Sequence, residues 1–140
     1  MRFWDSSALV PLMIAQAPSA VIRKLYAEDP QVTAWVLSDV EIRSALARLE
    51  RERAVTLKDF QEAVRRTEQL WQTVNVVSLV EAVKIRAKRL LGFHPLRAAD
   101  ALQLGAALAV TYDDPLSVEF VCLDARLTDA ARREGFVVLP

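Results

Sequence analysis

Four acidic residues, Asp5, Glu41, Asp100 and Asp124, occupy positions from which their carboxylates could act together. Asp5 and Asp124 each follow a short apolar run that is typical of a buried strand. Asp100 lies in an otherwise apolar segment, where an unpaired carboxylate is costly to bury. Glu41 falls in the first turn of an expected helix. Carboxylate oxygens clustered without His or Cys ligands suit a hard cation, so this set predicts a Mg²⁺ or Mn²⁺ site.

A divalent cation held by these side chains would serve phosphodiester hydrolysis. Such an ion lowers the pKa of a bound water, positions that water in line with the scissile bond and neutralises charge on the leaving oxygen. No side chain then needs to act as the nucleophile. His94 is the only histidine and stands before Pro95, which favours a loop residue. A metal-free mechanism with two histidines is therefore excluded.

Three of the four acidic residues also have a purely structural interpretation at a helix start. Asp5 and Asp124 could each cap the helix that follows. Glu41 fits a capping box with Ser38, in which two side chains satisfy free backbone N–H groups. The chemical interpretation therefore depends on whether the fold brings all four carboxylates together.

Expected strands and helices alternate along the chain. This alternation predicts an α/β fold, a three-layer sandwich whose parallel sheet of four to five strands is covered by helices on both faces. Sites in such sheets lie beyond the carboxyl ends of the strands, where Asp5 and Asp124 are expected. Pro11 must lie near the first turn of its helix, and Gly92 and Gly135 are expected to end theirs. The expected strands are 3–4, 32–36, 74–77, 118–123 and 136–139; helices begin after Ser6 or Ser7, at Pro18-Ser19, at Ser38 and at Thr56 or Asp59, and span 79–91, 96–110 and 127–133.

Length and composition indicate one folded domain. The chain has 140 residues, 53% of them hydrophobic, and 18 basic residues balance 18 acidic ones. Zero net charge gives no support to a nucleic-acid partner, although a local basic face remains compatible with one. The single cysteine, Cys122, excludes an internal disulfide or Cys-based zinc site and is most simply a small buried residue. No apolar run reaches the roughly 18 residues of a membrane span, and Asp5 interrupts any signal-peptide pattern, so we expect a cytoplasmic protein without a membrane partner.

Four segments carry a combined pattern: WDSSALV at 4–10, VEIRSAL at 40–46, LRAADALQL at 96–104 and VCLDARL at 121–127, the last continuing into AARREG at 130–135. In this order and spacing the chain resembles the PIN-domain ribonucleases. The resemblance is closest to the VapC-type toxins of type II toxin–antitoxin pairs. Two departures are Cys122, where the family often has Thr or Ser, and Pro11, where many relatives have a helix-friendly residue.

The resemblance implies a single PIN domain over residues 1–140 with strand order 3-2-1-4-5. It implies a metal-dependent endoribonuclease in which Asp5, Glu41, Asp100 and Asp124 bind the metal. Ser6, or a neighbouring hydroxyl, would orient Asp5. A small antitoxin whose tail lies over the acidic cleft and a homodimer are the implied protein partners. Apolar residues of the first two helices could form an interface, although core burial competes with this for about half of them: Leu9, Val10, Leu12, Met13, Ile14, Val21 and Ile22.

An RNA substrate beside an acidic site requires cations around the rim. Arg97, one helical turn before Asp100, is the best candidate, although it could instead pair with that carboxylate. Arg43, Arg48 and the run 84–89 are further candidates, and a solvated helix face is the simpler interpretation of that run. Motifs of dehalogenase-like phosphatases and of response-regulator receivers are absent. A catalytically idle PIN-like binding module and a housekeeping PIN nuclease without an antitoxin remain as alternatives.

Overall fold

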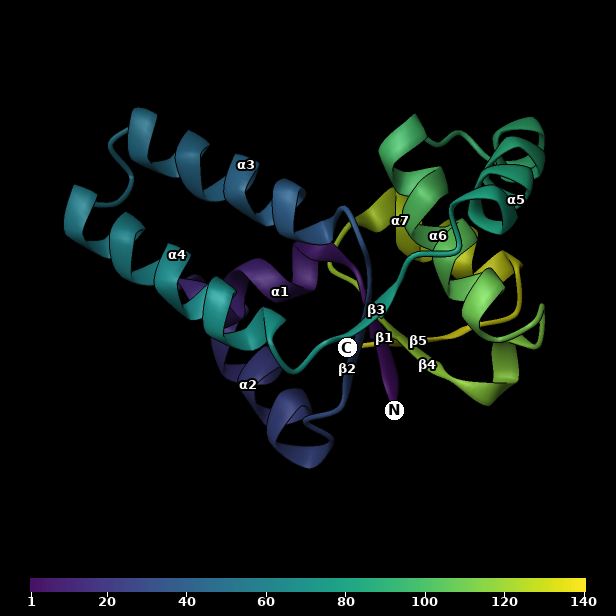
Figure 1. Ribbon diagram of the computed structural model, residues 1–140, viewed down its shortest axis with the longest axis horizontal. Helices are drawn as coiled ribbons and strands as arrows, with labels where there is room; N and C mark the ends of the chain where they lie inside the picture. The colour runs from purple at the N-terminus through teal and green to yellow at the C-terminus, as the bar shows by residue number, and fades with distance from the viewer.

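The computed structural model covers residues 1–140 and contains a parallel sheet of five strands in the order β3-β2-β1-β4-β5, as expected (Figure 1). Each neighbouring pair of strands is parallel. β1 is central, so the carboxyl ends of β1 and β4 lie side by side at one edge of the sheet. The strands are β1 (Arg2–Trp4), β2 (Val32–Trp35), β3 (Asn75–Val77), β4 (Glu119–Val121) and β5 (Val137–Leu139).

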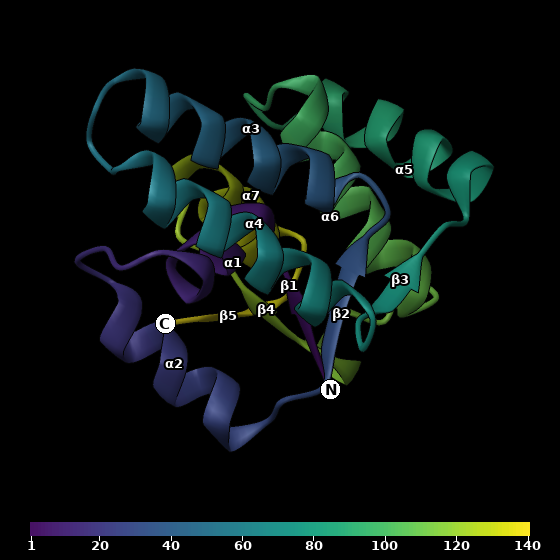
Figure 2. The same ribbon diagram turned by 60° about the vertical axis from the view of Figure 1, so that its left-hand side comes forward.

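Seven α-helices cover the two faces of the sheet in separate groups (Figures 1 and 2). The first four pack against one face and the last three against the other, which confirms the three-layer arrangement. None of the helices is both long and apolar enough to cross a membrane. The helices are α1 (Ser6–Met13), α2 (Ser19–Glu28), α3 (Ser38–Arg51), α4 (Leu57–Trp71), α5 (Val80–Phe93), α6 (Ala98–Val110) and α7 (Ala125–Arg133), with a short 3₁₀ turn at Pro115–Ser117.

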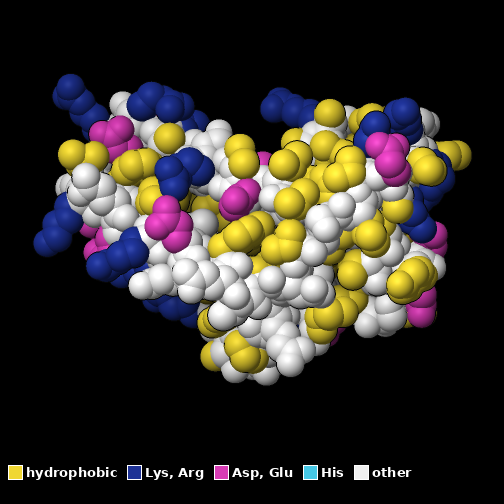
Figure 3. Space-filling model, viewed as in Figure 1, with side chains coloured by type: hydrophobic (Ala, Val, Ile, Leu, Met, Phe, Trp, Pro, Cys, Tyr) yellow, Lys and Arg dark blue, Asp and Glu magenta, His cyan; other side chains and the backbone are white.

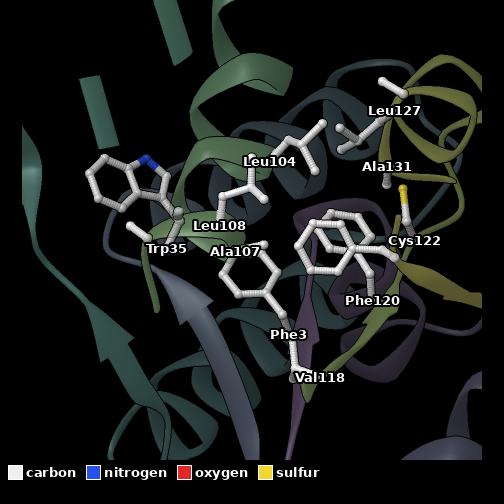
Figure 4. Packing of buried hydrophobic residues seen from close by; sticks show 14 of the residues in the cluster. Phe3, Trp35, Leu104, Ala107, Leu108, Val118, Phe120, Cys122, Leu127 and Ala131 are labelled. Atoms are coloured by element: carbon white, nitrogen blue, oxygen red, sulfur yellow. The ribbon is translucent and has the colours of Figure 1, made fainter. Parts of the chain in front are cut away.

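Successive residues of β1 supply both halves of the core because side chains alternate across a strand. Phe3 points toward α5, α6 and α7, where its ring stacks on Phe120 with centroids 5.4 Å apart (Figure 4). Trp4 points toward the opposite helices and meets Tyr26 edge to face. Both residues are fully buried. β1 is therefore held from both sides, which fixes the position of the residue that follows it.

Gly105 allows α6 to lie close against α5. A Cβ atom at this position would stand 3.0 Å from the Val83 carbonyl oxygen and 3.2 Å from the Ala87 nitrogen. The glycine therefore sets the depth at which α6, with Asp100 in its first turn, is seated against the rest of the fold.

Several local expectations need correction. Ser38 is not the cap of α3: the cap is Leu37, whose side chain makes no hydrogen bond. The expected Ser38–Glu41 capping box is absent, and in the first turn Asp39 Oδ1 accepts from the Val40 backbone N instead. Pro11 lies early in the second turn of α1, close to the expected position, and the helix ends two residues later at Met13. Gly92 lies within α5, which continues to Phe93.

The apolar residues of α1 and α2 that could have formed an interface are largely core residues. Five of them are at most 7% exposed and pack in the core between the sheet and α1 to α4: Leu9, Val10, Met13, Ile14 and Ile22. Leu12 is partly buried, and Val21 is the exposed exception at 41%. Exposed apolar side chains occur elsewhere in the chain, among them Leu37 and Val40 at the start of α3 and Leu79 and Val80 at the start of α5.

Glu134 joins α7 to the end of α5 and is expected to make stability depend on pH. Its carboxylate accepts a hydrogen bond from Arg89 at 2.7 Å and lies 2.7 Å from His94 Nε2. Burial by itself raises the pKa of Glu134, but the bonds from Arg89 and His94 outweigh it and hold that pKa below its usual range. Glu134→Gln should therefore cost about 1–3 kcal/mol of unfolding free energy at pH 7.

The stabilisation that ionised Glu134 gives the fold is present above the ordinary Glu pKa of about 4.3. It is lost as pH falls through the lowered pKa that Glu134 has in the folded protein. Urea unfolding of wild type and Glu134→Gln at pH 7 and pH 3 measures it. The difference between the two proteins should shrink at pH 3. A difference of equal size at both values would show that the Glu134 charge does not stabilise the fold.

Candidate active site

One cavity of about 210 Å³ collects all four predicted acidic residues. It lies where the carboxyl end of β1 meets the starts of α1, α3, α6 and α7 (Figure 1). The space-filling view is notched between the α3 side and the α6 side of the molecule (Figure 3). Asp5, Glu41, Asp100 and Asp124 line the cavity together with Ser6, Ser7, Val10, Ala45 and Arg48. The fold thus brings together residues that are far apart in the sequence.

Asp5 is both a helix cap and a wall of the cavity. Its Oδ2 accepts hydrogen bonds from the Ser7 backbone N at 2.9 Å and from the Ser7 hydroxyl. Asp5 is only 4% exposed, and burial raises its pKa to about 6 despite the bonds from Ser7; the neighbouring charges of Glu41 and Asp100 add to the rise. Asp5 therefore caps α1 and also presents a carboxylate to the cavity, so its structural role does not exclude a chemical one.

Ser7, rather than Ser6, orients Asp5. The Ser7 hydroxyl also accepts from the Leu123 backbone N at 3.0 Å, which ties the start of α1 to the segment just before Asp124. Ser6 instead donates to Glu41 Oε2 at 2.8 Å. The sequence left open whether Ser6 or a neighbouring hydroxyl orients Asp5, and the bond of the capping side chain to the residue two positions later selects Ser7.

Glu41 receives one hydrogen bond at each carboxylate oxygen. Besides the Ser6 bond to Oε2, Gln103 Nε2 donates to Oε1 at 3.1 Å. Burial raises the pKa of Glu41, and the charge of Asp100 adds to this, while the two hydrogen bonds act in the opposite direction. Gln103 was missed in the sequence; its signal is the three-residue spacing from Asp100, which places both on one face of a helix.

Asp100 and Asp124 both interact with the first turns of helices. Asp100 Oδ2 accepts from the Arg97 backbone N at 3.3 Å, so Arg97 meets this carboxylate through its backbone. Asp124 Oδ1 accepts from the Leu127 backbone N at 2.8 Å and caps α7. Burial raises the pKa of Asp100, as does the charge of Asp124, while the Arg97 backbone bond and the charges of Arg97 and Arg126 lower it.

Cys122 lies behind the acidic residues as a buried side chain, as expected. Its sulfur lies 3.8 Å from Asp5 Oδ2 and 3.6 Å from the Asp124 carbonyl oxygen. Burial and the charge of Asp5 raise the pKa of the thiol to about 12. The residue is therefore a neutral, weak donor at the position where the family often has a hydroxyl.

The donor chemistry of the cavity fits a hard divalent cation. Its acidic side chains offer oxygen atoms only, and their charges raise one another's pKa values, so a cation among them would relieve repulsion. No three acidic, His or Cys side chains of the structure stand close enough to form a metal site as they are placed. Binding of an ion would thus require side-chain movements of these carboxylates.

Arginines without an acidic partner surround the cavity. Arg48 lines it, and Arg97 and Arg126 are close enough to Asp100 to lower its pKa. None of the three forms a salt bridge. Most other basic candidates are engaged elsewhere: Arg43 pairs with Glu68, Lys84 with Glu81, Arg86 with Asp113 and Arg89 with Glu134.

Comparison with known proteins gives relatives over nearly the full length. No family model matches the chain. Two curated proteins from Mycobacterium tuberculosis strains, Ribonuclease VapC45 and Ribonuclease VapC49, are each 33% identical over 138 residues, which is 99% of this chain and 94% of theirs. The FitAcB crystal structure from Neisseria gonorrhoeae matches with a TM-score of 0.67 at 18% identity, over 100% of this chain and 97% of that one, and supports the PIN-like fold. By its identity and coverage against these ribonucleases, the chain belongs to the VapC family of PIN-domain ribonucleases.

Proposed function

We propose that the protein is a Mg²⁺- or Mn²⁺-dependent endoribonuclease that acts as the toxin of a toxin–antitoxin pair. The observation that carries the proposal is the meeting of four carboxylates from separate elements in one cavity beyond the carboxyl ends of the central strands. The relatives that are named ribonucleases support RNA as the substrate.

Asp5 and Asp100 would be the principal metal ligands, with Glu41 and Asp124 beside them. The metal, when bound, supplies an activated water and neutralises charge on the leaving oxygen. The protein's own groups prepare this chemistry: Ser7 orients Asp5, and Ser6 orients Glu41. Burial of Asp5 excludes bulk water from one wall of the cavity and strengthens its electrostatic interactions.

The unpaired arginines at the rim would bind the phosphates of the RNA strand on either side of the scissile bond. The antitoxin belongs to the same proposal: a segment of it that lies over the cavity would block access of RNA to the four carboxylates. Membership in the VapC family supports such a partner, and a homodimer is part of the proposal on the same ground.

The test is a cleavage assay on total RNA in Mg²⁺, in Mn²⁺ and in EDTA. Cleavage should occur with either metal and stop in EDTA, and expression without the antitoxin should arrest growth. Cleavage that continues in EDTA would overturn the metal-dependent mechanism. Cleavage without growth arrest would instead favour a housekeeping nuclease.

Arg48→Ala should weaken RNA binding with little change in the chemical step. Arg48 is exposed and lines the cavity without an ion pair, so its loss removes one phosphate contact. We expect KM to rise about fivefold, kcat to change less than twofold, and the salt dependence of log Kd to lose about 0.7 in slope. Arg43→Ala on the same helix is the matched control, because Arg43 pairs with Glu68. Equal effects of the two substitutions would contradict the role of Arg48.

A further inference from the structure

We infer that Gln103 is a positioning residue that holds the Glu41 carboxylate toward the acidic cavity. Gln103 does not line the cavity itself, so any effect on the site passes through Glu41. The inference rests on the function proposed above, because it gives Glu41 a task in binding the metal. It adds a residue to the four carboxylates that were predicted to bind the metal.

The hydrogen bonds of Gln103 fix its amide in one orientation. Nε2 lies 2.8 Å from Ser38 Oγ and 3.1 Å from Glu41 Oε1, so both of its hydrogens are used. The opposite orientation would place the amide oxygen against a carboxylate oxygen, and both are acceptors. The charge of Glu41 therefore selects the orientation of the amide, and the amide in turn constrains Glu41.

Packing alone does not explain an amide at this position. The Gln103 side chain is 1% exposed, and its Oε1 is buried without a hydrogen-bond partner. An unpartnered buried oxygen is costly, and a Met or Leu side chain of similar size would avoid that cost. The two bonds donated by Nε2 are what the protein gains from glutamine here.

Gln103 also joins the two helices that carry acidic residues. Ser38 and Glu41 are three residues apart on α3, and Asp100 and Gln103 are three apart on α6, so each pair shares a helix face. Ser6 holds the other oxygen of Glu41 from α1. A carboxylate bonded at both oxygens by different helices has little freedom to turn away from the cavity. The partners that orient a metal ligand typically contribute 10- to 100-fold to metal affinity.

The experiment measures Mn²⁺ affinity by titration calorimetry, without RNA. Gln103→Met keeps the side-chain volume and removes the amide, and we expect Kd for Mn²⁺ to rise about 10- to 100-fold. Ser38→Ala is the matched control, because it removes the other bond of the same amide and leaves the bond to Glu41. Its Kd should stay within about threefold of wild type, since the loss of a neutral hydrogen bond away from the site does not release Glu41.

A double-mutant cycle tests whether Gln103 acts through Glu41. Glu41→Gln and the double variant with Gln103→Met should bind Mn²⁺ equally well, because the effect of Gln103 is already lost. Additive losses would overturn the inference, as would an unchanged Kd in a Gln103→Met protein with a native circular dichroism spectrum. If that variant does not fold, Gln103→Asn, one methylene too short to reach both partners, decides by the same criterion.

The outcomes also separate this inference from the proposed function. Wild-type protein that binds no Mn²⁺ would overturn the metal-dependent function and, with it, the role of Gln103. Wild-type binding that depends on Asp100 but not on Gln103 would overturn the role of Gln103 alone.

Discussion

Asp100→Asn is expected to lower the rate of RNA cleavage about 10³-fold, which corresponds to roughly 4 kcal/mol in the activation barrier. Asp100 is one of the two principal ligands proposed for the metal, and Asn offers no negative charge to hold it. The same substitution should raise the Tm of the protein in EDTA. Burial and the charge of Asp124 raise the pKa of Asp100, so its ionised form destabilises the metal-free fold.

Thermal unfolding with added Mn²⁺ checks this prediction without RNA. A ligand that binds the folded state at 100 times its Kd stabilises that state by about 2.7 kcal/mol, so the wild-type Tm should rise with Mn²⁺. The Tm of the Asp100→Asn protein should not rise when Mn²⁺ is added. Asp39→Asn is the control, because Asp39 lies in the first turn of α3 but outside the acidic cavity. An Asp100→Asn protein that keeps a tenth of wild-type cleavage would contradict the ligand role.

The positions of the acidic residues were predictable because they follow from rules of topology. Asp5 and Asp124 come at the ends of apolar runs, and parallel strands bring their carboxyl ends to one edge of the sheet. Asp100 was identifiable because an unpaired carboxylate in an apolar helix is costly to bury. The strand order came from the family resemblance, and the structure confirms it.

The hydrogen bonds around these acids were not predictable in the same way. Ser38 and Glu41 match a local capping pattern, but both side chains bond Gln103, which is more than 60 residues away in the sequence. Whether a local or a distant partner takes such a side chain depends on how deeply α6 packs against its neighbours. No short sequence pattern encodes that depth, so the local rule gave the wrong partner.

Burial of the apolar residues was only partly predictable for a related reason. The periodicity of α1 and α2 shows that residues such as Leu9 and Ile22 face something apolar. It does not show whether that surface is the protein's own sheet or a second protein. The structure places both residues in the core, because α1 and α2 lie directly on the sheet beside α3 and α4.

Asp5→Asn separates the two roles of Asp5, since Asn caps a helix about as well as Asp. The Asn side-chain oxygen retains the bond from the Ser7 backbone N, so α1 should begin at the same residue. Cleavage should nevertheless fall about 10³-fold, because the charge that holds the metal is lost. If Asp5 served only as a cap, Asp5→Asn would cleave RNA at the wild-type rate.

Stability provides the second half of the test. The pKa of buried Asp5 is raised to about 6, so its ionised form costs the metal-free fold up to about 3 kcal/mol above that pH. In EDTA at pH 8, Asp5→Asn should therefore be more stable than wild type toward urea, and the advantage should vanish below pH about 4, where Asp5 is protonated in both states.

Asp5→Ala is the matched variant, because it removes the cap and the charge together. Losing the cap should make it about 1 kcal/mol less stable than Asp5→Asn at any pH, while both variants lose cleavage. Equal stability of the two would show that Asp5 does not cap α1. A wild-type protein as stable as Asp5→Asn at pH 8 in EDTA would show that the fold carries no cost for the Asp5 charge, and so no energy that binding of a cation could recover.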